Sequence, residues 1–417
     1  NYETLLKGLM SNSSLLFILA NTRSLSEKEV KKRLQEICSN IYKVSVENKI
    51  QNNLLFVSRG DSTLRGHNFL EPDLINQYLG PFDATFHIPA FLEGNRITVN
   101  GKHFVNGIPA HQTTFAKDKI FGYEINDLKK LLHEKSRFKI ELENIVNLSC
   151  IDQYSSYELK KIIQNLKNNT HVIVDIDKYS QLEKFSEIIR ELFNKKKFLF
   201  RTAASFLKSI SNTKNTKKNN FYYSQLRLRN KLNQFLPGLI IIGSYTDIST
   251  KQLEKLLELN FFEAVEFDVE KFYRFYVSKD NQTEIFKLKK KILKTIRTIF
   301  KKSLIPVFFT SRKEKVFANN FDQIDFNNSL SLFLAEIVAD IKHEIGYLIS
   351  KGGITSNTIL NTSFNIDYVY LEGQICSGIS LVKAKLINNK NLPVITFPGN
   401  LGNDYSLKEV WQSIENK

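Results

Sequence analysis

The sequence predicts an α/β protein made of two domains, each with a largely parallel sheet. Short apolar runs alternate with helical patterns almost throughout the chain, which is typical of βαβ units. A length of 417 residues is also long for a single hydrophobic core. A polar, Lys- and Asn-rich stretch at 209–221 interrupts this alternation near the middle, and we interpret it as a linker or exposed loop. We therefore expect domains at 1–220 and 221–417.

The elements expected in the first half follow from apolar runs and capping patterns. Residues 15–20 are wholly apolar and predict a buried strand. The pattern Ser26–Glu29 is a capping box and predicts a helix to about residue 42. A second such pattern, Ser180–Glu183, predicts a helix through residue 193. The remaining short apolar runs predict strands at 54–58, 85–88, 171–175 and 198–200.

The second half shows the same alternation. Strands are expected at 239–242, 306–309 and 394–397. The residues Ser249–Gln252 are expected to cap a helix. The stretch 330–348 reads either as one long amphipathic helix or as a helix followed by a strand.

The charge and the cysteine content argue against several classes of protein, and a basic nucleic-acid binder stays open as a third hypothesis that only the charge supports. The net charge of +16 comes mainly from Lys spread among Asn and aromatic residues, and the short, Asn-rich basic stretch at 214–218 is a poor groove for tracking a nucleic-acid backbone. Cys38, Cys150 and Cys376 lie far apart, so we expect small apolar fillers in a reducing compartment and no disulfide or zinc site. Without a signal segment, or a run of about 18 apolar residues, the protein is expected in the cytoplasm.

One polar cluster, at 58–67, follows a predicted strand at the place where α/β sheets bind their ligands. Arg59 and Arg65 offer planar guanidinium groups that can clamp a carboxylate or phosphate. Asp61 can accept hydrogen bonds from sugar hydroxyls or take a proton from the attacking one. The structural alternative, which the residues leave equally open, is that Asp61 caps the next helix and pairs with an arginine.

A long loop is expected between residues 89 and 118, which are rich in Gly, Pro, His and Arg. Ordered loops of this length are often functional. His103 lies within this loop and either contacts a ligand or satisfies backbone groups. For a single histidine we favour the second interpretation.

The second half contains four loops rich in small residues, each after a predicted strand. In the first, Gly352 and Gly353 let the backbone approach an anion, and Thr355 and Ser356 begin a helix where free N–H groups favour phosphate. Ordinary helix capping by Thr355 or Ser356 is the alternative. The other three loops are 243–246, 310–312 and 398–402. If all four converge on one crevice, a nucleotide is its natural occupant.

These stretches, taken in order, resemble the four-carbon acid sugar kinase family, which includes threonate, erythronate and 3-oxo-tetronate kinases. The most specific pair is SRGDSTLRGH at 58–67 and KGGITS at 351–356. The remaining matching stretches are ANTRSLS at 20–26, IPAFLEGNRIT at 88–98, TTFAKDKIFGY at 113–123, RTAASF at 201–206, GSYTDISTKQL at 243–253, TSR at 310–312 and FPGNLG at 397–402.

The resemblance implies a sugar-acid-binding N-terminal domain, an ATP-binding C-terminal domain, and an active site in the cleft between them. Mg²⁺ is expected with ATP, although no metal ligand can be named. Asp61 and Arg65 are the predicted catalytic residues. The predicted substrate-binding residues are Arg23, Arg59, Asp61, Ser62 and Arg65. The predicted nucleotide-binding residues are Ser244, Gly352, Gly353, Ile354, Thr355, Gly399 and Asn400.

One departure from the family concerns its acidic DDxTG segment, which lies on a first strand ahead of the part that resembles residues 2–9. We therefore expect the first strand and its acidic motif to be missing from this sequence, which begins at Asn1. An ATP-dependent kinase for a four-carbon sugar acid is the leading hypothesis. The alternative is a catalytically impaired homologue that binds nucleotide and sugar acid. The expected partners are a small sugar acid and ATP, with no nucleic acid and no membrane, and a homodimer is the oligomer considered.

Overall fold

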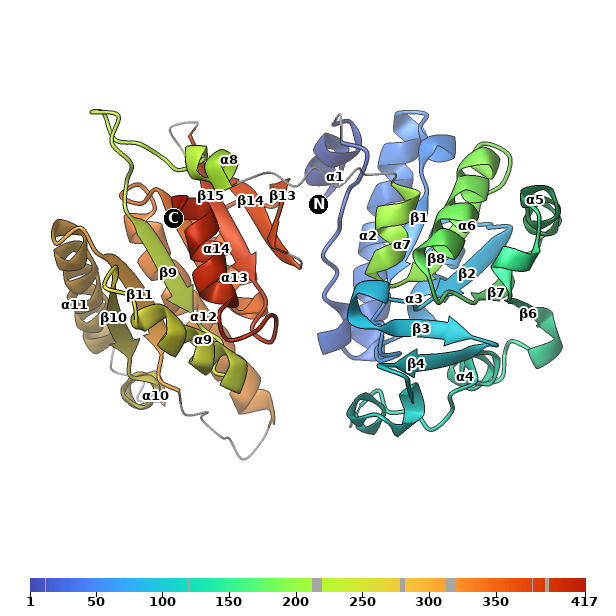
Figure 1. Cartoon of the computed structure of the whole chain (residues 1–417), viewed down its shortest axis with the longest axis horizontal. Helices are drawn as coiled ribbons and strands as arrows, with labels where there is room; N and C mark the ends of the chain where they lie inside the picture. The colour runs from blue at the N-terminus through green and yellow to red at the C-terminus, as the bar shows by residue number, and fades with distance from the viewer. Residues whose placement is uncertain are drawn as a thin grey trace. The chain divides into compact units, whose positions relative to one another are not determined.

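The computed structural model describes residues 1–11, 13–118, 120–211, 220–277, 282–312, 320–376, 378–386 and 390–417. The chain forms two compact units, Asn1–Asn215 and Thr216–Lys417 (Figure 1). Both are α/β units with largely parallel sheets, which confirms the predicted fold class. The basic stretch 214–218 lies outside the described residues, as do residues 212–219 of the predicted linker.

The sheet of unit 1 contains five parallel strands in the order β1-β8-β2-β7-β6. The sequence predicts four of these strands, and the fifth, β6, was missed. Their bounds are β1 (Phe56–Arg59), β2 (Ala84–Ile88), β6 (Ile145–Leu148), β7 (Thr170–Val174) and β8 (Phe198–Thr202). Strands β2 and β8 are buried along their whole length, as expected for strands covered on both faces.

Helices cover both faces of this sheet. Their bounds are α1 (Tyr2–Leu9), α2 (Glu27–Glu47), α3 (Leu70–Leu79), α4 (Leu128–Lys135), α5 (Ser156–Gln164), α6 (Tyr179–Leu192) and α7 (Ala204–Ile210). One core joins α5, α6 and α7 to the strands, while α1, α2 and α3 pack in separate clusters. The capping box at Ser26 is confirmed. The one at Ser180 is wrong, because α6 has already begun at Tyr179.

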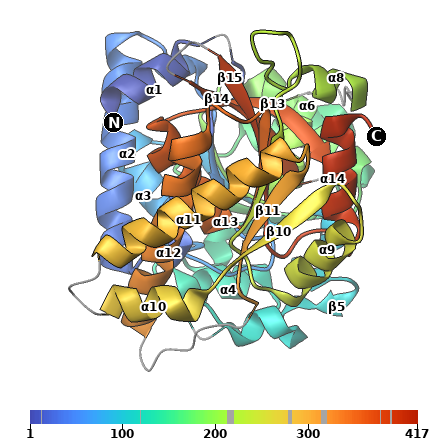
Figure 2. The ribbon, with the colours of Figure 1, turned by 90° about the vertical axis from the view of Figure 1, so that its left-hand side faces the viewer.

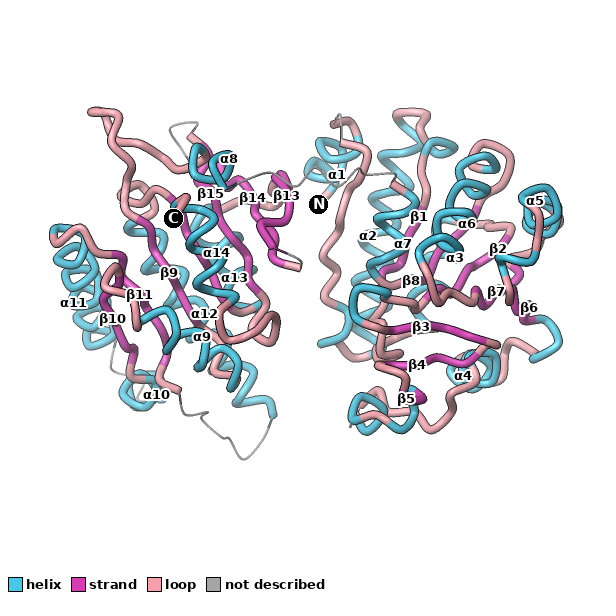
Figure 3. The backbone as a smooth tube through the Cα atoms, in the orientation of Figure 1, coloured by secondary structure: helices cyan, strands magenta, loops and turns pink. Residues whose placement is uncertain are grey.

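Residues 96–109 form a small antiparallel sheet where the sequence predicts a long loop (Figure 3). Its strands are β3 (Arg96–Val99), β4 (Lys102–Val105) and β5 (Ile108–Pro109). Both turns are Asn-Gly pairs with positive φ at each residue, at Asn100–Gly101 and Asn106–Gly107. Such pairs favour the tight turns of β-hairpins, since both residues tolerate left-handed backbone conformations.

The predicted strand at 15–20 is wrong. The segment has no regular secondary structure, and Phe17 and Leu19 are 60% and 72% exposed. A strand forms only where its N–H and C=O groups pair with a neighbouring strand. Within the described residues, β1 pairs only with β8, and residues 15–20 pair with no strand.

The sheet of unit 2 has seven strands in the order β10-β11-β9-β12-β15-β14-β13. The first five are parallel, and β14 and β13 add antiparallel at one end. The stretch 330–348 turns out to be a helix followed by a strand. The bounds are β9 (Gly238–Ile242), β10 (Phe262–Phe267), β11 (Ile305–Thr310), β12 (Tyr347–Lys351), β13 (Tyr370–Cys376), β14 (Ile379–Lys385) and β15 (Asn391–Phe397).

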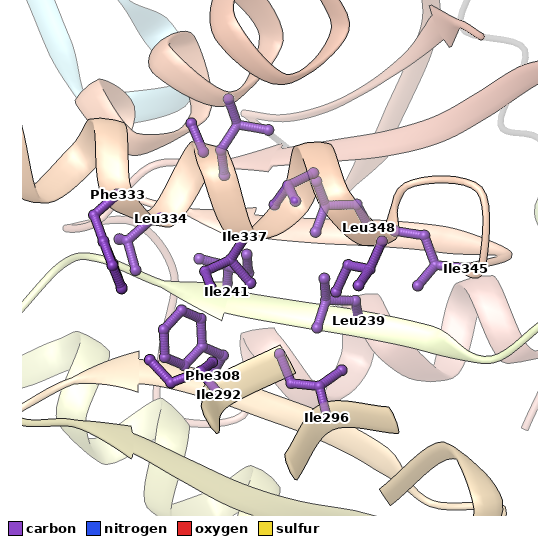
Figure 4. Close-up of a cluster of buried hydrophobic side chains, with 14 of the residues drawn as sticks. Leu239, Ile241, Ile292, Ile296, Phe308, Phe333, Leu334, Ile337, Ile345 and Leu348 are labelled. Atoms are coloured by element: carbon purple, nitrogen blue, oxygen red, sulfur yellow. The ribbon is translucent and has the colours of Figure 1, made fainter. Parts of the chain in front are cut away.

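Two helical layers cover the sheet of unit 2. On one face, α10 (Val269–Val277), α11 (Gln282–Lys301) and α12 (Asn320–Ile341) pack over the strands (Figure 2). Figure 4 shows how Ile292 and Ile296 of α11 and Ile337 of α12 meet side chains of the sheet.

The opposite face is covered by α8 (Asn220–Gln225), α9 (Asp247–Leu257) and α14 (Ser406–Glu415). The cap of α9 is Thr246, so the cap predicted at Ser249 is wrong; Ser249 already lies inside the helix. The short helix α13 (Gly353–Thr358) follows β12 and continues into a π-helical turn, Ile359–Ser363.

The three cysteines are free thiols. Cys38 is buried and Cys376 is half-buried, but Cys150 is exposed, so the prediction of a packed filler is wrong for Cys150. It adopts a left-handed conformation (φ 52°) just before a 3₁₀ turn, which places it at the surface. In the described part of the chain, no helix is both long enough and apolar enough to cross a membrane.

Candidate functional site

The first candidate site lies at the carboxyl ends of β1 and β8 in unit 1. These parallel neighbours continue into α3 and α7, which pack in different clusters on opposite faces of the sheet. Ligands of α/β sheets bind at such switch points, where the connections diverge. The amide of Gly60 donates to the carbonyl of Thr202 at 2.8 Å, which fixes the start of the polar loop against β8.

Asp61 is the centre of this site. Its Oδ2 atom lies 3.2 Å from Arg23 Nη1 and 3.0 Å from Arg65 Nη2. Its Oδ1 atom accepts hydrogen bonds from the amide and the hydroxyl of Thr63, each at 2.9 Å. Asp118 lies 3.8 Å from the same two guanidinium groups. The structure therefore brings together three of the predicted residues, Arg23, Asp61 and Arg65.

The predicted alternative for Asp61 holds only in part. Asp61 does pair with arginines, but the following helix α3 begins at Leu70 and Asp61 does not cap it. Burial by itself would raise the pKa of the Asp61 carboxyl. The hydrogen bonds from Thr63 and the charges of Arg65 and Arg23 outweigh burial and hold that pKa below its ordinary value. Asp61 is therefore a carboxylate at neutral pH.

Ser62 and Arg59, two further predicted residues, are placed differently. Ser62 is buried, and its hydroxyl accepts a hydrogen bond from Arg96 Nη1. Arg59 is exposed, and no polar partner for its side chain lies among the described residues. Arg59 is thus free to meet a ligand, whereas Ser62 is already used within the fold.

His103 forms a hydrogen bond with the backbone of the polar loop at 58–67, as predicted by the interpretation that it satisfies backbone groups. It is fully buried, and its Nε2 atom lies 2.8 Å from the Ser62 carbonyl while Nδ1 lies 3.0 Å from Thr98 Oγ1. A carbonyl can only accept, so Nε2 carries the proton and Nδ1 accepts from the Thr98 hydroxyl. His103 therefore positions the loop from inside the fold.

Arg96 is a residue that the sequence analysis did not assign to the site. It begins β3, its guanidinium lies 5.7 Å from the centroid of the Phe115 ring, and the Arg65 guanidinium lies 4.9 Å from the same ring. Its buried Nε atom has no hydrogen-bond partner in the described structure. Arg96 lies in the first strand of the Asn-Gly hairpins. Recognition of these hairpins in the sequence would have indicated that Arg96 lies near Asp61.

A buried ion pair lies directly under the loop. Arg201 Nη1 is 2.8 Å from Glu71 Oε2, and the two side chains are 7% and 12% exposed. Ser58 and Asn68 accept further hydrogen bonds from Arg201, at 2.7 and 3.1 Å. A Cβ atom at Gly60 would lie 2.8 Å from Arg201 Nε, so only glycine lets the chain pass so close.

We expect Glu71→Gln to destabilise unit 1 by about 3–5 kcal/mol, because it leaves the Arg201 charge buried without its counter-ion. Urea denaturation followed by circular dichroism measures this loss. Glu27→Gln is the matched control, since its partner Arg137 is 73% exposed and Glu27 is 51% exposed. That exposed pair should contribute less than about 1 kcal/mol. Equal losses in both variants would contradict the role given to burial.

The described residues of unit 1 enclose hollows at both edges of its sheet. One, of about 60 Å³, adjoins Asp61 at the carboxyl edge of the sheet and is lined by His87, Leu131 and Arg201 among others. The other, of about 250 Å³, lies at the amino edge around Leu54, Asp83 and Lys197. The smaller hollow is the functional candidate, because ligands of parallel sheets bind at the carboxyl edge.

The second candidate site lies in unit 2, where the four predicted loops converge. They follow β9, β11, β12 and β15, which are neighbouring parallel strands. The hydroxyls of Thr246 and Ser249 donate to the carbonyl of Gly399, at 3.0 and 2.7 Å. Arg312 Nη1 donates to the carbonyl of Ser244 at 2.8 Å. Strands β9 and β12 form the switch point, since α9 and the turn after α13 pack on opposite faces.

Close contact with side chains explains why glycine is required at Gly243 and Gly399. A Cβ atom at Gly399 would lie 2.4 Å from Ser244 Oγ, and one at Gly243 would lie 2.1 Å from Thr355 Oγ1. Gly352 has φ +125°, and a Cβ atom at Gly353 would meet nothing within 4 Å. Gly352 is the N-cap of α13, and no side chain caps that helix, so the capping alternative for Thr355 and Ser356 is wrong.

The other two predicted nucleotide-binding residues lie at the surface of these loops. Ile354 is 62% exposed, and Asn400 is exposed beside Gly399. An exposed isoleucine next to two glycines offers an apolar surface without filling the turn. The site of unit 2 therefore combines close backbone turns, a guanidinium group and one exposed aliphatic side chain.

Each unit matches a known domain model. A sugar-binding N-terminal domain matches residues 3–210, and a nucleotide-binding C-terminal domain matches residues 239–407. The first site lies within the former range and the second within the latter.

Individual proteins are similar to this chain over different lengths. A D-erythronate kinase of Heliobacterium modesticaldum is 44% identical over 64 residues, a match that spans only 15% of this chain and 15% of that protein. The crystal structure of Haemophilus influenzae protein HI1011 is 16% identical with a TM-score of 0.66, covering 94% of this chain and 88% of that one. A Salmonella typhimurium LT2 protein, provisionally named a tRNA synthase, is 13% identical with a TM-score of 0.69, covering 93% and 86%.

At such low identity the two crystal structures support the fold alone. The two domain models cover both units in the expected order and include both switch-point sites. On this ground the chain belongs to the four-carbon acid sugar kinase family.

Proposed function

We propose that this protein transfers the γ-phosphoryl group of ATP to a hydroxyl of a four-carbon sugar acid. The observation that carries the proposal is that each domain has a polar site at its own switch point. The site of the sugar-binding domain is rich in guanidinium groups, which suit a carboxylate ligand, and that of the nucleotide-binding domain is built from close backbone turns, which suit phosphates.

In the sugar-binding domain, Arg23, Arg59 and Arg65 would hold the carboxylate of the acid. Asp61 would accept a hydrogen bond from the reacting hydroxyl and receive its proton. Because the pKa of Asp61 is lowered, it is a weak base, and its main contribution is to orient the hydroxyl oxygen toward phosphorus. Phosphoryl transfer needs little more than positioning and charge neutralisation, so a weak base suffices.

The residues of the nucleotide-binding domain fit the phosphates of ATP. The open space at the exposed Gly353 leaves room for a phosphate beside the backbone, and Arg312 adds a nearby cation. Mg²⁺ would neutralise phosphate charge. In the described residues no three His, Cys, Asp or Glu side chains form a metal-binding group, so the ion would be bound mainly by phosphate oxygens and water.

A second function has one observation in its favour. Both oxygens of Asp61 already accept hydrogen bonds or pair with arginines, so this carboxylate is occupied before any substrate arrives. A homologue that binds sugar acid and nucleotide without turnover would have the same arrangement.

The test is ADP release in a coupled assay with Mg²⁺, ATP and a panel of four-carbon sugar acids: threonate, erythronate and 3-oxo-tetronate isomers. We expect release that depends on one or a few of these acids. ATP binding without acid-dependent release across the panel would favour the binding homologue. ADP release that is independent of any acid would overturn the kinase proposal.

A further inference from the structure

Lys351 is a fully buried lysine at the last position of β12. Its Nζ atom donates to the carbonyl of Pro398 at 3.1 Å and lies 3.9 Å from the centroid of the Phe397 ring. Across the described ranges of the chain, no carboxylate forms an ion pair with it. A buried ammonium group with one hydrogen bond and no counter-ion is costly for the folded state. The fold therefore tolerates a positive charge that nothing in the described structure neutralises.

Hydrogen bonds connect Lys351 and its neighbour Gly352 to two other loops of the second candidate site. The carbonyl of Lys351 accepts from the amide of Gly243 at 3.0 Å, and the next amide, Gly352, donates to the carbonyl of Phe397 at 2.8 Å. The Nζ atom itself is bound to the loop that contains Gly399. The charge therefore lies at the start of the loop that contains Gly399, one of the predicted nucleotide-binding residues.

We propose that Lys351 is the cation that the phosphate groups of the bound nucleotide neutralise. The inference rests on the proposed nucleotide site, but it does not depend on the sugar acid or on turnover. Opposite charges attract strongly where water is excluded, so a cation beside the loop of Gly399 favours phosphate over uncharged ligands. The unpaired charge destabilises the free protein. Binding of a phosphate removes this destabilisation, and the free energy released adds to the affinity for the nucleotide.

Burial alone lowers the pKa of Lys351, to about 8. No neighbouring charge contributes, although other titratable side chains lie on β12, β13, α14 and the loop after β11: Tyr347, Cys376, Glu409, Glu415 and Arg312. Helix α9 adds Lys251 and Glu254, which are both exposed. Lys351 is thus charged below pH 8, and a bound phosphate would raise its pKa. ATP affinity should weaken as the pH rises above 8, by up to about tenfold per pH unit.

The experiment is calorimetric titration of the whole protein with ATP and with adenosine, in the absence of sugar acid, at pH 7 and pH 9. We compare the wild type with Lys351→Met and with Lys385→Met, which removes an exposed lysine of β14. We expect Lys351→Met to weaken ATP binding at pH 7 by roughly tenfold or more and to leave adenosine binding unchanged. The free Lys351→Met protein should also melt at a higher temperature, because a buried charge is gone. Lys385→Met should behave like the wild type.

Two outcomes would overturn the inference in different ways. Unchanged ATP affinity in Lys351→Met, with a wild type that binds ATP, would remove the role of Lys351 and leave the nucleotide site standing. A wild type that binds no ATP would remove the nucleotide site itself. If Lys351→Met does not fold, Lys351→Arg answers the question, because a guanidinium keeps its charge at pH 9. This variant should bind ATP equally well at both pH values, and a loss at pH 9 equal to that of the wild type would contradict the proposal.

Discussion

Replacing Asp61 by Asn should lower kcat/KM for the sugar acid by about 10²- to 10⁴-fold, the usual contribution of a positioned acid–base group. The amide can neither take the hydroxyl proton nor attract the two guanidinium groups that now lie 3.2 and 3.0 Å from the carboxylate. Arg23 and Arg65 would therefore lose their common anchor as well. Steady-state kinetics with the acid identified by the coupled assay measures the effect.

Asp118→Asn is the matched control for Asp61→Asn. Asp118 faces the same guanidinium groups at the longer distance of 3.8 Å and is mostly held by backbone amides of the loop at Ile120 and Phe121. Its loss should be much smaller. ATP affinity should be the same in both variants, because these residues belong to the sugar-binding domain. A larger loss for Asp118→Asn than for Asp61→Asn would contradict the role assigned to Asp61.

The second large effect concerns pH and the sugar-binding domain. His87, His103 and His171 are buried, and His87 Nε2 lies 3.0 Å from His171 Nδ1. Burial lowers the pKa of His103 and that of His171 to about 4 each. Burial, aided by the charges of His171 and Arg201, lowers the pKa of His87 well below its ordinary range. All three rings are therefore neutral in the folded protein at moderately acidic pH.

Acid should unfold this domain first. Unfolded histidines bind protons near pH 6.5 and the folded ones do not, so the unfolded state holds more protons between pH 6.5 and 4. The contribution of each buried histidine to the free energy of unfolding is fully present above pH 6.5. As the pH falls below 6.5, the free energy of unfolding decreases by about 1.4 kcal/mol per pH unit for each such histidine. For His103 and His171 together the loss approaches about 6 kcal/mol at pH 4.

Urea denaturation at pH 7.5, 5.5 and 4.5 checks this expectation. The nucleotide-binding domain has one histidine, the exposed His343, so it has no buried histidine to destabilise it at acidic pH. His103→Gln should reduce the pH slope of the sugar-binding domain by about one proton, while His343→Gln should not change it. A sugar-binding domain as stable at pH 4.5 as at pH 7.5 would contradict the buried neutral state of the three rings.

The sequence predicted the parallel layers well because their strands are buried on both faces. Runs such as 239–242 are wholly apolar, and only a covered strand needs such a run. The sequence also predicted that the loops of the nucleotide-binding domain converge, because neighbouring parallel strands end at the same edge of a sheet. Which strands are neighbours is decided by contacts far apart in the chain, and no local pattern contains that order.

The errors come from local signals that tertiary structure overrode or that were not used. Residues 15–20 have the composition of a strand but no neighbour to pair with. The Asn-Gly turns at 100–101 and 106–107 could have predicted the hairpins of 96–109. They were overlooked because the high Gly and Pro content of the segment indicated a loop. Glu71 could not be linked to Arg201 from the sequence, because α3 and β8 meet only in the folded domain.

The strand order of the sugar-binding domain also has a consequence for folding during synthesis on the ribosome. Strand β8 lies between β1 and β2, yet it is the last of the five strands to be synthesised. Until residues 198–202 leave the exit tunnel, β1 has no partner and β2 has only one. Pairings this distant in sequence form slowly, because a long loop must close first. The nascent domain therefore keeps its apolar strands uncovered for most of its synthesis, which is the interval in which a chaperone would act.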